Sequence, residues 1–390
     1  MKTSAPAPLP NDLPRPSSAR PVWPTARAKA LAWQICGVAT WFARLGAKML
    51  GRTRKVDVLI YKVDRLGDWL LAEPAIARIV ADAQARRGTV AVWAASESAA
   101  LRDWRRPDFH VETFALEPSG LLAKLVRALS VVRLLAVYRA KTLICLRHSP
   151  EPIRDFVLAH AEAGEIHALS WRIFRGPLGV VPFEILRHQA ILAGVGLAPH
   201  DVRELLPRLP GRNAQRSTRV IMAPFSSSSI KDWRDDAWCN VAAGLAGRGL
   251  QFELWVGSRQ RAQAKEFALK LAQRVGGGNV TVSSGALAEL AEAMDAAALV
   301  LTVDTFAAQL AVSMDAPMVS LIGGGQYGDF GPWRRSSRQR WVTNPLPCFG
   351  CDWHCTRSRI ECLVDITSLQ VLSEAEDVLR LEMEGTHPVS

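Results

Sequence analysis

Hydrophobic and polar positions along the chain form two successive blocks in which strand-like and helix-like segments alternate. In the first block, β-branched apolar runs predict strands at 56–61, 89–95, 110–115 and 142–146. A charged segment with several prolines, 197–218, interrupts the pattern and predicts an interdomain linker. The second block then predicts strands at 219–225, 252–257, 280–283, 299–303 and 318–322.

Segments with apolar residues at helical spacing lie between these strands. They predict helices at 68–84, 121–141, 183–193, 235–248, 259–275, 286–297, 305–314 and 368–384. Strand–helix alternation of this kind predicts an α/β fold with two Rossmann-like, doubly wound parallel sheets. We expect one domain at 56–200, a second at 215–347, and a final section at 348–390 with clustered cysteines and an acidic helix.

The first 55 residues form an extension of different character. Residues 1–24 are rich in Pro, Ser and Ala, which predicts disorder. Apolar residues then recur at helical spacing, at Leu31, Ile35, Val38, Phe42, Leu45 and Met49. The helix that they predict has two interpretations: it lies on an anionic membrane leaflet, or it packs on the body of the protein.

Positive charge is concentrated in this extension. The formal net charge of the chain is +11, and residues 1–55 hold ten Lys or Arg against one Asp. The rest of the chain has 38 basic and 36 acidic residues, so it is nearly neutral. A nucleic-acid-binding body would need a basic face of its own. The charge therefore slightly favours the membrane interpretation and gives no support for a nucleic-acid partner.

Other features of composition set the class and the compartment. A length of 390 residues and a hydrophobic fraction of 49% permit two α/β cores. Cys36, Cys145 and Cys239 are scattered among apolar residues, which indicates buried thiols in a reducing compartment. No stretch of the sequence is long and apolar enough to predict a transmembrane helix. We expect a cytoplasmic protein.

Candidate chemistry is found where predicted strands end, because ligands of open α/β sheets bind at the carboxyl ends of the strands. After the first strand, Asp68 is predicted at the start of a helix, whose dipole stabilises a carboxylate. Asp68 is a candidate general base, and a helix cap is the more common use of Asp at such a position. Arg147, at the end of the strand at 142–146, is a candidate acceptor contact or an ion-pair residue.

The second block has three such junctions. A Ser-rich turn with Ser227 and Ser228 ends at Lys231, which suggests a phosphate cradle or a flexible polar loop. Asp304 and Thr305 follow a strand and could orient a sugar and a diphosphate, or cap the next helix. Gly324 lies in a run of three glycines that permits close approach of a ligand to the backbone. A flexible loop would explain these glycines equally well.

In their joint order, these motifs resemble glycosyltransferase family 9, the heptosyltransferases of lipopolysaccharide core assembly. The resemblance covers the chain from about residue 56 to the C-terminus. In the first half it is carried by Asp64, Arg65, Gly67, Asp68 and Pro74. In the second half it is carried by Lys231 and Trp233 and, in part, by Asp304, Thr305 and Ala311.

The resemblance implies two Rossmann-like domains that face a cleft, the GT-B architecture. It implies inverting transfer of a heptose-like sugar from a nucleotide-activated, ADP-heptose-like donor to a lipopolysaccharide-core or other glycan acceptor. Asp68 would be the base, and Lys231 with the helix start at Thr305 would stabilise the leaving diphosphate. Ser227, Ser228, Asp304 and Gly324 would also contact the donor, and Arg65 and Arg147 the acceptor.

No cofactor or catalytic metal is implied, and the expected location is cytoplasmic, at the inner face of the bacterial inner membrane.

The chain departs from the family pattern at two positions. Phe306 and Gln309 stand where the family has Gly and His. The departure supports an alternative function, a catalytically silent protein of the same fold that binds a nucleotide or a lipid.

Four further cysteines are closely spaced: Cys348, Cys351, Cys355 and Cys362. This spacing fits a structural zinc or an iron–sulfur site, or a compact loop of reduced or partly bridged thiols.

Overall fold

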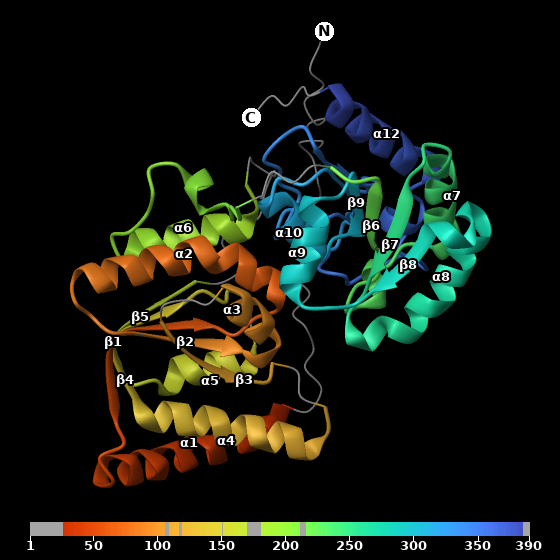
Figure 1. Cartoon of the computed structure of the whole chain (residues 1–390). Coiled ribbons are helices and arrows are strands. Elements are labelled where there is room, and N and C mark those ends of the chain that lie inside the picture. The colour runs from red at the N-terminus through yellow and green to blue at the C-terminus, as the bar shows by residue number, and fades with distance from the viewer. Residues whose placement is uncertain are drawn as a thin grey trace. The chain divides into compact units, whose positions relative to one another are not determined.

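The computed structural model describes residues 26–105, 109–116, 119–149, 151–169, 181–210 and 216–384. The disorder predicted for 1–24 lies outside these residues. The chain divides into two compact units, each built around its own sheet (Figure 1). The N-terminal unit extends to Leu205, and the C-terminal unit begins at Leu206 and includes 181–183.

The N-terminal unit contains five parallel strands in the order β3-β2-β1-β4-β5. The strands are β1 (Arg54–Lys62), β2 (Val90–Ala95), β3 (His110–Phe114), β4 (Tyr138–Cys145) and β5 (Ala163–Ala168). The α-helices are α1 (Ala26–Met49), α2 (Leu66–Ala85), α3 (Ala99–Arg105), α4 (Leu121–Val137), α5 (Pro152–His160) and α6 (Phe183–Gly194). The described residues of this unit also form two 3-10 turns, η1 (Ser96–Ser98) and η2 (Val202–Leu205).

Helices cover both faces of this sheet (Figure 1). α2 and α6 lie on one face, and α4 and α5 lie on the other. α1 is an additional layer that packs outside α4. Beneath α4, the Trp93 and Tyr138 rings meet edge to face with their centroids 5.8 Å apart. The sheet is therefore buried on both faces, as parallel sheets normally are.

The C-terminal unit contains six parallel strands in the order β11-β10-β9-β6-β7-β8. The strands are β6 (Arg219–Ala223), β7 (Gln251–Trp255), β8 (Val280–Ser283), β9 (Leu299–Val303), β10 (Met318–Leu321) and β11 (Gln339–Val342). The α-helices are α7 (Asp235–Ala246), α8 (Arg261–Val275), α9 (Leu287–Asp295), α10 (Phe306–Ser313), α11 (Glu361–Val364) and α12 (Ser368–Glu384). The described residues of this unit also form three 3-10 turns, η3 (Ser229–Lys231), η4 (Ser258–Gln260) and η5 (Gly277–Asn279).

The predicted fold class is confirmed, and every predicted strand overlaps an observed one. The helix predicted at 121–141 ends at Val137, because β4 begins at Tyr138, four residues earlier than expected for its strand. The sequence pattern missed β5 and β11. These are edge strands rich in polar residues, so they lack the continuous apolar run of a central parallel strand.

Within the described ranges, no helix combines the length and the apolar character needed to cross a bilayer.

Candidate functional site

The first cluster of candidate residues lies at the topological switch point of the N-terminal sheet. β1 lies between β2 and β4, so the winding of the sheet reverses between β1 and β4. Lys62 ends β1 and Asp64 follows it, while Arg147 follows β4. In doubly wound sheets this is the place where ligands bind, so the topology itself brings these side chains together.

Lys62 is the centre of this cluster. Its side chain is fully buried, and its Nζ lies 3.1 Å from Asp64 Oδ2 and 3.1 Å from Glu184 Oε1. The Nζ also donates a hydrogen bond of 3.0 Å to the Leu146 carbonyl. Burial lowers the pKa of Lys62, but the carboxylates of Asp64, Glu184 and Asp68 outweigh this effect and raise it. Lys62 is therefore a permanent buried cation.

Arg147 is a second cation held by the same carboxylate. Its Nη1 lies 3.1 Å from Asp64 Oδ1, and it donates a hydrogen bond to the Val63 carbonyl. Burial lowers the pKa of Arg147, but Asp64 and other nearby anionic groups outweigh burial and raise it. The ion-pair interpretation of Arg147 is confirmed, and its contact with an acceptor stays a prediction.

Asp68 is the third residue of α2, and it is half-buried. The N-cap is Arg65, which is exposed and in extended conformation, with no side-chain capping hydrogen bond. The interpretation of Asp68 as the helix cap is therefore wrong, because the helix begins two residues earlier than predicted. The negative charge of Asp68 contributes to the raised pKa of both Lys62 and Arg147. Asp68 thus lies in the first turn of a helix, near enough to both cations to interact with them electrostatically, and is partly exposed to solvent.

Sequence reasoning missed three buried residues beside Lys62. Ligand atoms of His148, Glu184 and His188 lie within 4.8 Å of one another. Glu184 is, however, already paired with Lys62 and with Arg187, whose Nη1 is 3.3 Å from Glu184 Oε2. These cations neutralise the one anionic ligand and disfavour a metal ion. The spacing of Glu184, Arg187 and His188 along one face of a helix was the available signal.

The second cluster lies at the switch point of the C-terminal sheet, where β6 pairs with β9. Lys231 ends η3 after β6, and Asp304 follows β9. Lys231 Nζ lies 3.0 Å from Asp304 Oδ2 and 3.4 Å from the Asp304 carbonyl oxygen. The same ammonium lies 5.7 Å from the centroid of the Trp353 ring. Two residues predicted for the donor site are therefore in direct contact, and Trp353 is a neighbour that sequence reasoning missed.

The Ser-rich turn before Lys231 is anchored at both ends. The Ser226 N–H donates to Asp232 Oδ1 at 2.7 Å, and Gln260 donates to the Ser226 carbonyl at 2.9 Å. Trp233 is buried, and its Nε1 donates to the Ile366 carbonyl at 3.2 Å. Ser227 and Ser228 are exposed between these anchors. The geometry suits a fixed cradle for an anion.

Thr305 is the N-cap of α10, as one of the sequence interpretations predicted. Its side-chain oxygen accepts from the Ala307 N–H at 3.3 Å. Within α10, Gln309 is buried; it accepts from Trp333 Nε1 at 2.6 Å and donates to the Phe330 carbonyl at 3.1 Å. Gln309 therefore holds the following loop in place.

The lack of a side chain at Gly324 allows another part of the protein, the Phe349 ring, to pack against its backbone. A Cβ at this position would lie 2.3 Å from the Phe349 ring, and the Gly324 N–H donates to Cys362 Sγ at 3.2 Å. The glycines thus seat the cysteine-rich segment 348–362 against the backbone. Contact of Gly324 with a donor stays a prediction.

The four clustered cysteines are free thiols, and burial raises the pKa of Cys351 and Cys362. Among the described residues, no three of these sulfur atoms come within 4.8 Å of one another. A metal at this loop also stays a prediction.

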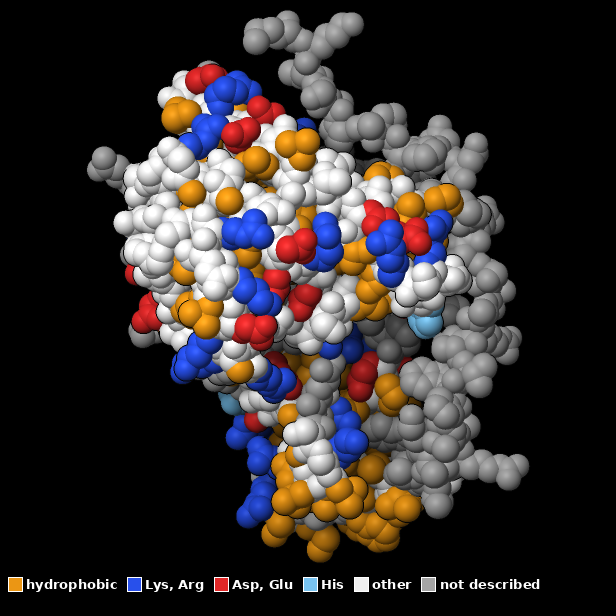
Figure 2. Space-filling model, turned by 90° about the vertical axis from the view of Figure 1, so that its right-hand side faces the viewer, with side chains coloured by type: hydrophobic (Ala, Val, Ile, Leu, Met, Phe, Trp, Pro, Cys, Tyr) orange, Lys and Arg blue, Asp and Glu red, His pale blue; other side chains and the backbone are white. Residues whose placement is uncertain are grey.

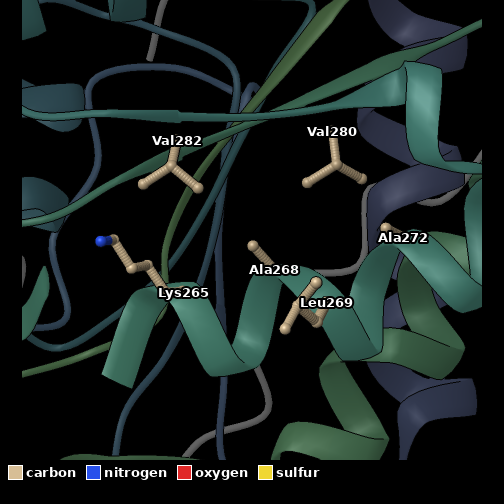
Figure 3. A pocket seen from close by; sticks show the side chains of 6 residues that line it. All are labelled: Lys265, Ala268, Leu269, Ala272, Val280 and Val282. Carbon is tan, nitrogen blue, oxygen red and sulfur yellow. The ribbon is translucent and has the colours of Figure 1, made fainter. Parts of the chain in front are cut away.

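An apolar hollow between α8 and β8 lies apart from these residues (Figure 3). It is lined by Lys265, Ala268, Leu269, Ala272, Val280 and Val282. Lys265 is its one charged group, so the hollow offers little that would orient a polar substrate.

Residues 197–355 match the model of glycosyltransferase family 9 (heptosyltransferase). The resemblance to glycosyltransferase family 9 is confirmed. The match to the family model includes Lys231, Asp304 and Gly324, and it does not include Asp68. No curated protein sequence matches the chain.

Solved heptosyltransferase structures share the fold. The E. coli heptosyltransferase WaaC with ADP-2-deoxy-2-fluoro heptose has a TM-score of 0.55 and 18% identity, over 85% of this chain and 100% of that chain. The E. coli ADP-heptose lps heptosyltransferase II has a TM-score of 0.58 and 14% identity, over 84% of this chain and 100% of that chain.

A third structure is the dodecameric iron-containing heptosyltransferase TibC in complex with ADP-D-beta-D-heptose, from enterotoxigenic E. coli. It has a TM-score of 0.51 and 16% identity, over 84% of this chain and 77% of that chain. At these identities, the matches with all three structures establish the two-sheet architecture.

Proposed function

We propose that the protein is an inverting glycosyltransferase that transfers a heptose-like sugar from an ADP-heptose-like donor to a lipopolysaccharide-core or other glycan acceptor. The observation that carries this proposal is the Lys231–Asp304 pair at the switch point of the C-terminal sheet. This pair lies inside the segment that matches the family model. A cation and a carboxylate at that edge support a nucleotide-sugar donor, since its diphosphate is anionic and its sugar hydroxyls can donate to a carboxylate.

On the donor side, Lys231 neutralises the charge that builds on the leaving diphosphate. Ser227 and Ser228 donate to phosphate oxygens, and the N–H groups at the start of α10, beside Thr305, add further donors. Asp304 accepts a hydrogen bond from a sugar hydroxyl, and the Gly324 backbone borders the donor. Because Lys231 and the helix start supply the positive charge, we propose that transfer is independent of a metal.

On the acceptor side, Asp68 removes the proton of the attacking hydroxyl as its oxygen bonds to the anomeric carbon. The bond between that carbon and the diphosphate oxygen breaks on the opposite face, which inverts the configuration. Lys62 and Arg147 lie near enough to interact electrostatically with Asp68 and favour its anionic form. Arg147 and Arg65 contact the acceptor.

We also propose that the acceptor is lipid-linked and that the protein works in the cytoplasm, at the inner face of the bacterial inner membrane. The basic extension and the family resemblance support this location.

The test compares transfer and donor hydrolysis for wild type and Asp68→Asn over a panel of nucleotide sugars. The variant is expected to lose about 10²–10⁴-fold in rate, the usual contribution of a general base, with unchanged donor affinity by calorimetry. The matched control is Asp82→Asn on the same helix, where the carboxylate forms a 2.8 Å surface pair with Arg86. The control should keep the wild-type rate, because such pairs contribute little.

Equal rates for wild type and Asp68→Asn would remove Asp68 from the mechanism. Donor binding without turnover for every sugar nucleotide would instead identify a silent binding protein.

A further inference from the structure

The apolar stripe of α1 faces away from the protein. Ile35, Val38, Phe42, Leu45 and Met49 follow helical spacing and are 48–79% exposed. An apolar stripe of this kind normally faces the core. Here it does not: α1 packs on the body, as one of the two interpretations predicted, and presents its apolar residues outward.

The opposite side of α1 attaches it to the protein. Thr40 and Ala47 are buried, and a Cβ at Gly37 would lie 3.0 Å from the His160 ring. Arg44 donates to the Leu135 carbonyl at 3.3 Å and forms an ion pair with Glu162 at 3.3 Å. Small residues and one anchored arginine thus fix the rotation of the helix and hold its apolar stripe outward.

The first half of α4 extends this apolar surface. α1 and α4 lie side by side (Figure 1). The exposed residues of α4 are Leu121, Leu122, Leu125, Val126 and Leu129. Of the seventeen exposed large hydrophobic side chains in the described part of the chain, twelve belong to these two helices or to Leu50 just after α1. We call the outer surface of the two helices the α1–α4 face.

Figure 2 shows this concentration as a continuous apolar area at the bottom of the molecule, with Lys and Arg side chains beside it. A patch of this extent is unfavourable in water and is typical of an interaction surface.

Charge indicates what covers this face. Neither α1 nor α4 contains an Asp or a Glu, whereas Lys48 of α1 and Lys124 of α4 are exposed cations. A second copy on the same face would bring like charges together. The headgroups of an anionic bilayer would neutralise these charges, while the acyl region takes up the apolar side chains.

We infer that the α1–α4 face docks on an anionic lipid bilayer, with both helices lying in the plane of the interface. Each helix then covers its apolar side without crossing the membrane, in agreement with the lack of a spanning helix among the described residues. α4 connects β3 to β4, so it begins at the carboxyl edge of the sheet, the edge that also carries Asp64 and Asp68. Docking therefore leaves this edge beside the bilayer, with α2 on the face of the sheet that is turned away from the lipid. Access of a lipid-linked acceptor to Asp68 past this edge rests on the proposed function.

The test is flotation of the full chain with vesicles of equal parts phosphatidylcholine and phosphatidylglycerol, and with phosphatidylcholine alone. We expect binding to the anionic vesicles that weakens with salt. Phe42→Gln with Leu125→Gln removes two apolar contacts without a change of charge, and should weaken binding roughly tenfold or more. The control Leu369→Gln removes a side chain of similar exposure (74%) on α12 and should bind like wild type.

Circular dichroism of each variant confirms folding, which these exposed positions should not disturb. Wild-type binding by the double variant, or a lack of binding by wild type, would overturn the inference. Analytical ultracentrifugation adds an independent outcome: a dimer that the double variant dissociates, without vesicle binding, would assign the face to a second copy. Flotation needs no donor, so its result is independent of whether the proposed transfer occurs.

Discussion

Lys231 and Asp304 lie 73 residues apart in the sequence, and their side chains form a 3.0 Å ion pair. Each follows the end of a strand, and the two strands are neighbours in the sheet. The Asp304 side chain is only 8% exposed, so the charge of its carboxylate is compensated by Lys231 rather than by water. The Lys231 side chain is 21% exposed. The lysine therefore faces both an internal carboxylate and solvent, where a diphosphate can approach.

Lys231→Met should weaken binding of a nucleoside diphosphate about tenfold or more, because a charge-assisted hydrogen bond to phosphate is lost. It should also lower stability, since Asp304 is left as a buried charge without its partner. Calorimetric titration with ADP and urea unfolding measure the two effects. Lys265→Met, at an exposed lysine of the same unit, is the control and should change neither.

The double variant Lys231→Met with Asp304→Asn separates the two roles. Its stability should recover toward wild type, because no unpaired charge remains, while binding of ADP stays weak. Recovery of ADP binding in the double variant would mean that Lys231 only compensates Asp304.

The stability of the N-terminal unit should fall as the pH decreases below about 6.5. Burial lowers the pKa of His148 and His188 from the ordinary value of 6.5, so both stay neutral in the folded state. The unfolded chain binds these protons first, and stability is therefore lost as the pH falls. The slope reaches about 1.4 kcal/mol per pH unit for each histidine.

A second loss of stability of the N-terminal unit is expected below about pH 4.5. Burial would raise the pKa of Glu184, but the Lys62 ammonium outweighs it and holds this pKa well below 4.5. Urea unfolding across the pH range measures both losses. His188→Gln should reduce the slope below pH 6.5, and His200→Asn, at an exposed position, should leave it unchanged. A flat profile for wild type would show that the buried histidines are charged in the folded state.

Gly324→Ala should destabilise the C-terminal unit by about 1–3 kcal/mol, because the added methyl group overlaps the Phe349 ring. The cysteine-rich segment 348–362 should then shift, and faster reaction of Cys362 with a thiol reagent would report it. The control is Gly278→Ala, where a Cβ meets no atom within 4 Å. Wild-type stability and thiol reactivity in Gly324→Ala would show that the ring moves aside at no cost.

The order of strands and helices, and with it the fold class, could be predicted from the sequence. Buried parallel strands are continuous apolar runs, and this local signal survives without any knowledge of the partner strands. The same reasoning placed Lys231 and Asp304 at one site, because the carboxyl ends of neighbouring parallel strands share an edge. The polar edge strands β5 and β11 lack that signal, and the pattern missed them.

Only the tertiary structure decided which side of each helix faces the protein and which charged side chains pair. Periodicity identifies the apolar stripe of α1, but it does not set the rotation of the helix. That rotation depends on the small residues of its inner side and on Arg44, which contacts Leu135 of α4 and Glu162 after α5. Lys62 meets Glu184 across 122 residues of sequence, and no local pattern encodes that distance. Local spacing fixes what a segment can form, whereas burial, ion pairing and exposure depend on contacts between segments that come together only when the chain packs.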